Sequence, residues 1–273
     1  MKRKLLLALS CLLLFGLVGC QGKNDSEKAS GEKDGEKMDI IVFAAASLTE
    51  SMEEIKALYE KENPNVNIIY TFDSSGTLKT QIEEGGKADI FISAAQKQMN
   101  ALDPEVNADL GDKTIDSASR IDLLENKVCL VVPKGSTKGI SSFEDLNTDL
   151  VEAIALGNSD VPVGQYSEEI LTNLGIWDQI QDKVTYGSNV KEVTTWVAEA
   201  VVDCGLIYKT DAYSAGLEVV YEEDGSHLET PVVYPAALVA NSEVAEEAGK
   251  FLDYLQGPEA TEIFEGVGFS PAK

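Results

Sequence analysis

Four short stretches of this chain bring hydroxyl groups or bare backbone N–H groups to the start of a helix. The first runs from Asp39 to Glu50 and contains a short β-branched run, three alanines and then Ser47. Apolar residues recur at helical spacing after Ser47, and Ser47 with Glu50 three residues later forms a capping-box pattern. A helix N-terminus carries unpaired N–H groups and a partial positive charge, which suits an anion. Taken alone, this stretch is better explained by Ser47 capping its own helix.

Three further stretches share this arrangement, and together the four describe a site of neutral hydrogen-bond donors. They are Ser74-Ser75-Gly76, Pro162-Val163-Gly164 and Ser188-Asn189-Val190. None of them contains Arg, Lys or His, although Lys191 follows Val190 directly. Each stretch alone needs no functional explanation, because Ser and Gly are common at turns and caps.

The protonation state of the anion would separate the candidate ligands. A fully deprotonated oxyanion needs only donors, whereas phosphate keeps a proton and needs an acceptor such as a carboxylate. Asp73 and Asp160 lie beside two of the four stretches, so the sequence leaves that acceptor open. After residue 20 the chain contains one arginine, Arg120, and one histidine, His227, so no arginine cluster can hold the ligand.

The elements that must position these residues alternate between strands and helices. Apolar β-branched runs predict strands at residues 40–43, 66–72, 88–93, 128–132, 153–156, 205–208 and 232–240. Helical spacing predicts helices after Ser47 and near 78–82, 94–102, 143–146, 166–174, 190–201 and 245–257, with a loop at 161–164. This alternation predicts an α/β fold with a mostly parallel sheet, in which ligands bind beyond the carboxyl ends of the strands.

The N-terminal segment has the pattern of a secretory signal. Lys2, Arg3 and Lys4 precede an apolar run at 5–18 that is short for a membrane span. Residues 17–20, LVGC, resemble the lipobox of bacterial lipoproteins. This resemblance implies a signal peptide at 1–19, a lipid on Cys20 and a location at the outer face of the cytoplasmic membrane; the alternative is ordinary cleavage nearby. Residues 20–37 would be a disordered tether, since 21–37 contain a single apolar residue, Ala29.

Composition excludes several classes of partner. The net charge of −25 becomes −28 once residues 1–20, with three basic and no acidic side chains, are removed. Nucleic acid and an anionic lipid surface are therefore unsuitable partners for the folded part. Cys129 and Cys204 can pair outside the cytoplasm, but nothing in the sequence brings them together. No CxxC, HExxH or Cys/His cluster occurs, so no zinc or iron site is predicted.

Several motifs, in order and with matching spacing, resemble the periplasmic molybdate-binding proteins of ABC importers. In the first part of the chain they are AAASLT at 44–49, FDSSGTL at 72–78, QIEEG at 81–85 and ADIFISA at 88–94. Further along they are VPVGQY at 161–166, GLIYKTDA at 205–212, YP at 234–235, YLQGPEA at 254–260, IF at 263–264 and GF at 268–269. The resemblance covers nearly all of the chain after the signal.

The resemblance implies a site that captures molybdate or tungstate and delivers it to a membrane permease. In the family the tetrahedral anion is held by two serine hydroxyls, backbone N–H groups and one tyrosine hydroxyl. Carried onto this chain, these are the hydroxyls of Ser47, Ser75 and Tyr208 and the backbone N–H groups of Ser47, Ser75, Val163 and Val190. The family match alone selects Ser75 rather than Ser74. Molybdenum enters only within the bound oxyanion, no cofactor is implied, and the protein is expected to act as a monomer.

The implied fold is a two-lobed type II periplasmic-binding-protein fold, each lobe a mostly parallel sheet flanked by helices. Roughly 235 residues after the tether are enough for two lobes. Lobe 1 is expected at 38–121 and 236–273 and lobe 2 at 122–235. The two hinge strands are expected near 125–127 and 233–235.

Two other functions remain open from the sequence. The first is a binding protein of the same fold for another oxyanion, such as sulfate or phosphate. The second is a secreted hydrolase with Ser47 as nucleophile, which would need a general base nearby. His227 lies in a polar stretch with no motif around it, and no GxSxG sequence occurs, so we expect a binding protein rather than an enzyme.

Overall fold

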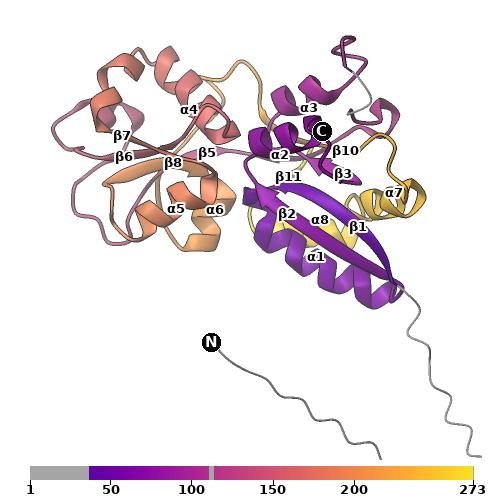
Figure 1. Ribbon diagram of the computed structural model, residues 1–273. Helices are drawn as coiled ribbons and strands as arrows, with labels where there is room; N and C mark the ends of the chain where they lie inside the picture. Colours follow the sequence, from indigo (N-terminus) through magenta and orange to yellow (C-terminus); the bar gives the residue numbers. More distant parts are fainter. Residues whose placement is uncertain (1–36, 111–113, 273) are drawn as a thin grey trace, which may run out of the picture. The chain divides into compact units, whose positions relative to one another are not determined.

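The computed structural model describes residues 37–110 and 114–272. The predicted signal peptide at 1–19, the predicted lipid site Cys20 and nearly all of the predicted tether lie outside these residues. Within the described part, no helix is both long enough and apolar enough to cross a membrane. The described residues form two β-sheets, each with helices packed against it (Figure 1).

The first sheet has six strands in the order β11-β4-β10-β3-β1-β2. They are β1 (Met38–Ala45), β2 (Val66–Asp73), β3 (Ile90–Ile92), β4 (Ile121–Asn126), β10 (Val232–Leu238) and β11 (Ser270–Pro271). β1 pairs in parallel with β2 and β3, whereas β10 is antiparallel to β3 and β4. Parallel β1, β2 and β3 bring their carboxyl ends to one edge, where the Ser47 and Ser75 segments begin.

Helices cover both faces of the first sheet, because β1 is apolar without interruption from Ile40 to Ala45 and so has apolar side chains on both faces. Ile40 and Val42 belong to one core cluster with Met52 and Ile55, whereas Phe43 belongs to another. The helices are α1 (Thr49–Glu62), α2 (Ser75–Glu83), α3 (Gln96–Leu102), α7 (Ala245–Tyr254) and α8 (Pro258–Gly266), with 3₁₀ turns η1 (Ala46–Leu48) and η2 (Ser117–Ser119). α1 and α8 lie together on one side, and α2 and α3 lie together on the other (Figure 1).

The second sheet has five strands in the order β7-β6-β8-β5-β9. They are β5 (Val128–Val132), β6 (Ile154–Gly157), β7 (Val184–Gly187), β8 (Cys204–Tyr208) and β9 (Glu218–Glu222). Its helices are α4 (Pro162–Asn173), α5 (Val190–Ala198) and α6 (Lys209–Ala215), with 3₁₀ turns η3 (Phe143–Asn147), η4 (Trp177–Gln179) and η5 (Gln181–Lys183). β6 is parallel to β7 and β8, so α4 and α5 start at the same edge.

Both sheets are mixed, and this corrects the expectation of mostly parallel sheets. The parallel parts are the strand–helix repeats β1-β2-β3 and β6-β7-β8. The strands next to the passages between the sheets run antiparallel: β4 and β10 in the first sheet, β5 and β9 in the second. A strand that carries the chain out of a sheet and one that brings it back must run in opposite directions, and the helical pattern does not show this.

The chain passes from the first sheet to the second at Lys127 and returns between β9 and β10. The first passage falls within the predicted hinge at 125–127. The second precedes the predicted hinge at 233–235, which lies inside β10. By strand pairing, residues 122–126 and 232–235 join the first sheet, although the sequence places them in lobe 2. The residue boundaries of the two lobes stay a prediction.

Cys129 and Cys204 are free and buried in neighbouring strands of the second sheet. The antiparallel register pairs Cys129 with Ile207, three residues beyond Cys204, so the two thiols do not face each other. Burial raises the pKa of each thiol to about 12. Both therefore stay protonated at neutral pH and act as small apolar side chains of the core.

Candidate functional site

A small cavity lies where the loops of the two sheets meet. Its lining comes from both sheets: Ala45, Ala46, Ser47, Asp73, Ser74, Ser75, Ala94, Val161, Pro162, Val190 and Tyr208. Four of the five predicted site residues are in this lining. The fifth, Val163, is fully buried directly after Pro162 on α4. The structure thus brings together residues from positions 47 to 208 of the sequence around one compact space.

Ser47 is buried in η1, between the end of β1 and the start of α1. Its hydroxyl oxygen lies 2.9 Å from the hydroxyl oxygen of Tyr234 on β10. The predicted capping role is absent, since no side-chain cap bond is present at η1 or α1. The Ser47 hydroxyl is therefore free of the local role that best explained it from the sequence.

Ser74 and Ser75 have different roles, and the difference agrees with the choice of Ser75. Ser74 is the N-cap of α2: its hydroxyl accepts a hydrogen bond from Thr77 N–H (3.1 Å) and lies 2.9 Å from the Thr77 hydroxyl. The fully buried Ser75 hydroxyl accepts a hydrogen bond from Ala94 N–H at 2.9 Å. Because that oxygen already accepts, the Ser75 proton remains available as a donor.

Gly76 brings the two walls of the cavity into direct contact. Its N–H donates to the backbone oxygen of Asp160, just before α4, at 3.1 Å. A Cβ at Gly76 would lie 2.3 Å from that oxygen, a distance that no side chain can occupy. Glycine at this position therefore has a packing reason: α2 of the first sheet and the α4 loop of the second could not approach this closely otherwise.

The backbone N–H groups of Val163 and Val190, which are predicted donors, lie in the first turns of α4 and α5. Val163 is the second residue of α4 and Val190 the first of α5. The first N–H groups of a helix have no partner within it. Among the described residues, neither of these two N–H groups has an acceptor. Pro162 starts α4, so the predicted loop at 161–164 is instead the beginning of a helix, where proline is well tolerated.

Tyr208 ends β8, and its side chain is almost completely buried. Its hydroxyl donates to the backbone oxygen of Ala94 at 3.2 Å. Burial raises the pKa of Tyr208 well above 10, so the phenol keeps its proton. Tyr208 and Ser75 thus contact the same residue, Ala94, from opposite sides of the cavity. To donate to a ligand, the phenol would exchange the Ala94 oxygen for the anion.

The two carboxylates that the sequence left open have different positions. Asp73 lines the cavity, and its Oδ1 accepts a hydrogen bond from Ser74 N–H at 2.7 Å. Asp160 is exposed, and its backbone rather than its side chain contacts α2. Asp73 is therefore the one acidic side chain in the described lining that could accept a proton from a bound ligand.

A charged cluster beside the site was not identified from the sequence. Lys191, on α5 after Val190, lies 2.6 Å from Oε2 of Glu50 on α1 and 3.1 Å from Oδ1 of Asp211 on α6. Burial raises the pKa of Asp211 to about 6, although the Lys191 charge opposes this rise. Only the position of Lys191 next to Val190 could have indicated this cluster, because its partners lie far away in the sequence.

His227 does not contact Ser47. Its Nδ1 lies 3.0 Å from Oε2 of Glu223 and 3.1 Å from the hydroxyl of Ser226. The hydroxyl partner of Ser47 is Tyr234, whose pKa burial raises well above 10. A protonated phenol does not remove a proton from serine, so the contacts of Ser47 give no support to a nucleophile.

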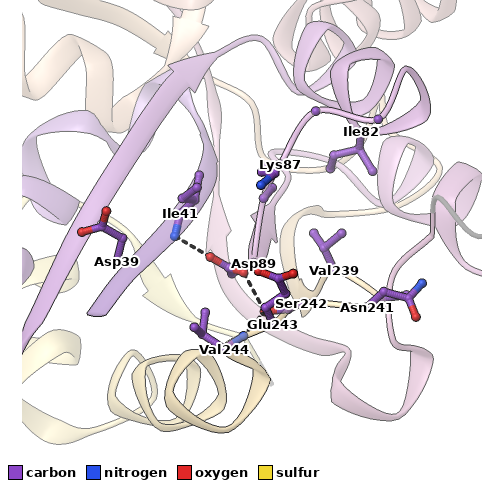
Figure 2. Close-up of a pocket in the computed structure, with 14 residues that line it drawn as sticks. Asp39, Ile41, Ile82, Lys87, Asp89, Val239, Asn241, Ser242, Glu243 and Val244 are labelled. Carbon is purple, nitrogen blue, oxygen red and sulfur yellow. Dashed lines mark hydrogen bonds between the residues drawn. The ribbon is translucent and has the colours of Figure 1, made fainter. Parts of the chain in front are cut away.

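A larger cavity, of about 510 Å³, lies at the opposite end of β1 and contains none of the predicted site residues (Figure 2). Asp89 stands at its centre, accepting hydrogen bonds from Ile41 N–H (2.7 Å) and the Ser242 hydroxyl (2.6 Å). Asp39, Asp89 and Glu243 line it together with a single cation, Lys87. This charge balance disfavours an oxyanion.

Two sheets of mixed strands, with helix N-termini and hydroxyl groups from both around one cavity, form a two-lobed α/β binding protein. The chain belongs to the bacterial extracellular solute-binding proteins, whose family model matches residues 40–270.

Two relatives and one solved structure are similar to this chain over most of its length. The chain is 37% identical over 260 residues to YvgL of Bacillus subtilis, a substrate-binding lipoprotein assigned to an ABC transporter, covering 95% of this chain and 94% of that one. It is 39% identical over 240 residues to the molybdate-binding protein ModA of Escherichia coli, covering 85% and 88%. A substrate-binding domain from Clostridium difficile, assigned to a molybdenum ABC transporter, is 35% identical with a TM-score of 0.65, covering 87% and 100%.

Proposed function

We propose that this protein captures molybdate, and also tungstate, outside the cytoplasm and delivers it to the membrane permease of an ABC importer. The observation that carries the proposal is the cavity between the sheets, where Ser47, Ser75 and Tyr208 bring hydroxyls and α4 and α5 bring N-termini. The relative named as a molybdate-binding protein and the solved domain named for a molybdenum ABC transporter support the choice of ligand. The proposed ligand contacts are the Ser47, Ser75 and Tyr208 hydroxyls and the N–H groups of Ser47, Ser75, Val163 and Val190.

The donor set suits an anion without protons. Helix N-termini and hydroxyls supply partial positive charge without a cationic side chain in the lining. Because the donors come from both sheets, a tetrahedral dianion contacts all of them only when the two walls are close together. Binding would therefore favour a closed arrangement of the lobes.

Sulfate or phosphate is the second candidate ligand, and Asp73 in the lining is the observation that favours phosphate. Calorimetric titration of the purified protein with molybdate, tungstate, sulfate and phosphate separates the two. We expect similar affinities for molybdate and tungstate and much weaker binding of sulfate, whose shorter bonds leave buried donors unpaired. Equal affinity for sulfate would instead identify a general oxyanion-binding protein.

The proposed location is the outer face of the cytoplasmic membrane, with the protein held by a lipid on Cys20 and acting as a monomer. The LVGC sequence at 17–20 and the polar stretch behind it support the anchor. The relative named as a lipoprotein supports it as well.

A further inference from the structure

The hydroxyl of Ser47 is the start of a hydrogen-bonded chain that leads away from the cavity. Ser47 Oγ lies 2.9 Å from the Tyr234 hydroxyl on β10. Nδ2 of Asn126, at the end of β4, lies 3.1 Å from the same hydroxyl and 3.0 Å from Oγ1 of Thr210 on α6. All four side chains are buried. The chain thus joins a proposed ligand contact to the strand from which the backbone passes to the second sheet.

The orientation of the Asn126 amide is fixed by the backbone. Lys127 N–H donates to Oδ1 of Asn126 at 2.8 Å, so the oxygen side of the amide faces Lys127. The NH₂ side therefore faces Tyr234 and Thr210, and an NH₂ group can only donate. The Tyr234 oxygen must accept from Asn126, which leaves its single proton for Ser47.

The phenol of Tyr234 is held in this position by its surroundings. Its side chain is fully buried, and its ring packs edge-on against Tyr208 at 5.6 Å and Phe269 at 5.2 Å between centroids. Burial raises its pKa well above 10, so the proton is present at every working pH. Ser47 Oγ consequently accepts from Tyr234, and its own proton points elsewhere.

We propose that Tyr234, oriented by Asn126, is a positioning residue that turns the Ser47 proton toward the ligand and so favours oxyanions without a proton over those that carry one. Ser75 is oriented in the same sense, because its oxygen accepts from Ala94 N–H. Each of these two hydroxyl oxygens has one lone pair already occupied, so its proton is the group most readily turned toward the ligand. An oxyanion without a proton therefore fits the pair better than one that carries a proton. This inference rests on the proposed function for the contact between Ser47 and the anion.

The first test compares wild type with Tyr234→Phe for two anions of similar size, sulfate and phosphate, by calorimetry at pH 8. Sulfate carries no proton there, whereas phosphate keeps one. Without the phenol, the lone pair of Ser47 that Tyr234 occupied is also free to accept from phosphate, so the preference for sulfate should fall by about fivefold or more. Tyr70→Phe is the matched control, since the Tyr70 hydroxyl donates to Met52 O at 2.9 Å away from the cavity. An unchanged preference in Tyr234→Phe overturns the proposal, as does wild type that binds phosphate as well as sulfate through Asp73.

The second test reverses the direction of the chain with Asn126→Asp. A carboxylate accepts where the amide donated, so Tyr234 would donate to residue 126 and Ser47 would donate to Tyr234. Ser47→Ala should then cost about tenfold or more in molybdate affinity in wild type and less than about twofold in the Asn126→Asp background. An equal loss of molybdate affinity in the two backgrounds overturns the proposed hydrogen-bonded chain from Asn126 through Tyr234 to Ser47. The added negative charge is present in both members of the variant pair and cancels in this comparison.

Folding and function are checked separately. Thermal unfolding of each variant identifies any that fail to fold, and the conservative Tyr234→Phe keeps the ring contacts. If wild type binds molybdate but neither of the two expected effects is seen, only the role of Tyr234 and Asn126 fails. If wild type binds none of the oxyanions, the proposed function fails, and the role of Tyr234 and Asn126 fails with it.

Discussion

Lys191 on α5 and Glu50 on α1 form an ion pair that links the helices of the two sheets beside the site, with Nζ 2.6 Å from Oε2 and 2.8 Å from Oε1. Glu50 lies three residues after Ser47, and Lys191 follows Val190. Both side chains are partly exposed, so the pair alone contributes modestly. Because the pair joins helices of the two sheets, we expect this contact to break when the two walls of the cavity move apart.

The first prediction is that Lys191→Met and Glu50→Gln each weaken molybdate binding by about threefold, mainly through faster dissociation. Stopped-flow measurement of Trp196 fluorescence on α5 follows the release. Lys250→Met is the control, because Lys250 pairs with Glu246 within α7. Dissociation rates that do not change in either variant would show that the ion pair does not stabilise the closed arrangement.

The second prediction separates the two neighbouring serines. Ser75→Ala removes a hydroxyl that is free to donate and should weaken molybdate binding by about tenfold to a hundredfold. Ser74→Ala removes an N-cap and should mainly lower the free energy of unfolding, by about 1 kcal/mol. Calorimetry and urea unfolding measure the two effects. A larger loss of affinity in Ser74→Ala than in Ser75→Ala would reverse the assignment.

The third prediction concerns Tyr208. Tyr208→Phe should weaken molybdate binding by about tenfold, at the low end for a hydrogen bond to a charged group. The reason is that the phenol gives up its contact with the Ala94 oxygen, 3.2 Å away, when it donates to the anion. Tyr166→Phe, on α4, serves as a second buried tyrosine outside the described lining. An affinity equal to that of wild type would remove Tyr208 from the site.

The fourth prediction follows from Asp211, whose pKa burial raises from 3.8 to about 6. Between about pH 4 and pH 6 the folded state keeps a proton that the unfolded state has lost, so stability falls as the pH rises through this range. Asp211→Asn should remove this fall. Relative to wild type, the free energy of unfolding of the variant should therefore rise by on the order of 2 kcal/mol between pH 4 and pH 7. Urea unfolding across this range measures it.

Asp203 is the control of opposite sign for that measurement. Burial alone would raise the pKa of Asp203, but hydrogen bonds from Lys138 and from the N–H groups of Glu152 and Ala153 outweigh it and lower the pKa. Its contribution is present at neutral pH and is lost as the pH falls below about 4. Asp203→Asn should therefore lose stability at pH 7. A wild-type profile that does not fall between pH 4 and pH 6 would contradict the role of Asp211.

The fifth prediction concerns the proposed anchor. Cys20→Ser should release the protein from the membrane fraction or leave its signal unprocessed, because the variant has no thiol to which the lipid can be attached. Cell fractionation with detection of the processed size measures both outcomes. Cys129→Ser, in the buried core strand β5, should leave membrane retention unchanged. A normally processed Cys20→Ser protein that stays on the membrane would exclude the anchor.

Much of the fold could be predicted because its elements are encoded locally. The apolar runs of β1, β2, β5 and β8 and the periodicity of α1 and α5 are visible in the sequence. The strands β4, β7, β9 and β11 and the helices α6 and α8 are not predicted from the sequence. Glu125 in β4 and Glu218 and Glu222 in β9 are charged, and these strands are held by pairing with a neighbouring strand rather than marked by an alternating apolar pattern.

The sequence by itself determined the proposed donors, which are serines, small residues and helix starts in four stretches. Caps and helix N-termini depend on residues within one turn of each other, so they can be read locally. Only the tertiary structure decided which groups are free to act. It assigned Ser74 to its helix cap, gave Ser47 a partner 187 residues away in Tyr234, and placed Glu50 and Asp211 on either side of Lys191. These pairings depend on how the two sheets and their helices pack. Local sequence periodicity does not specify the distance between residues that are far apart in the chain.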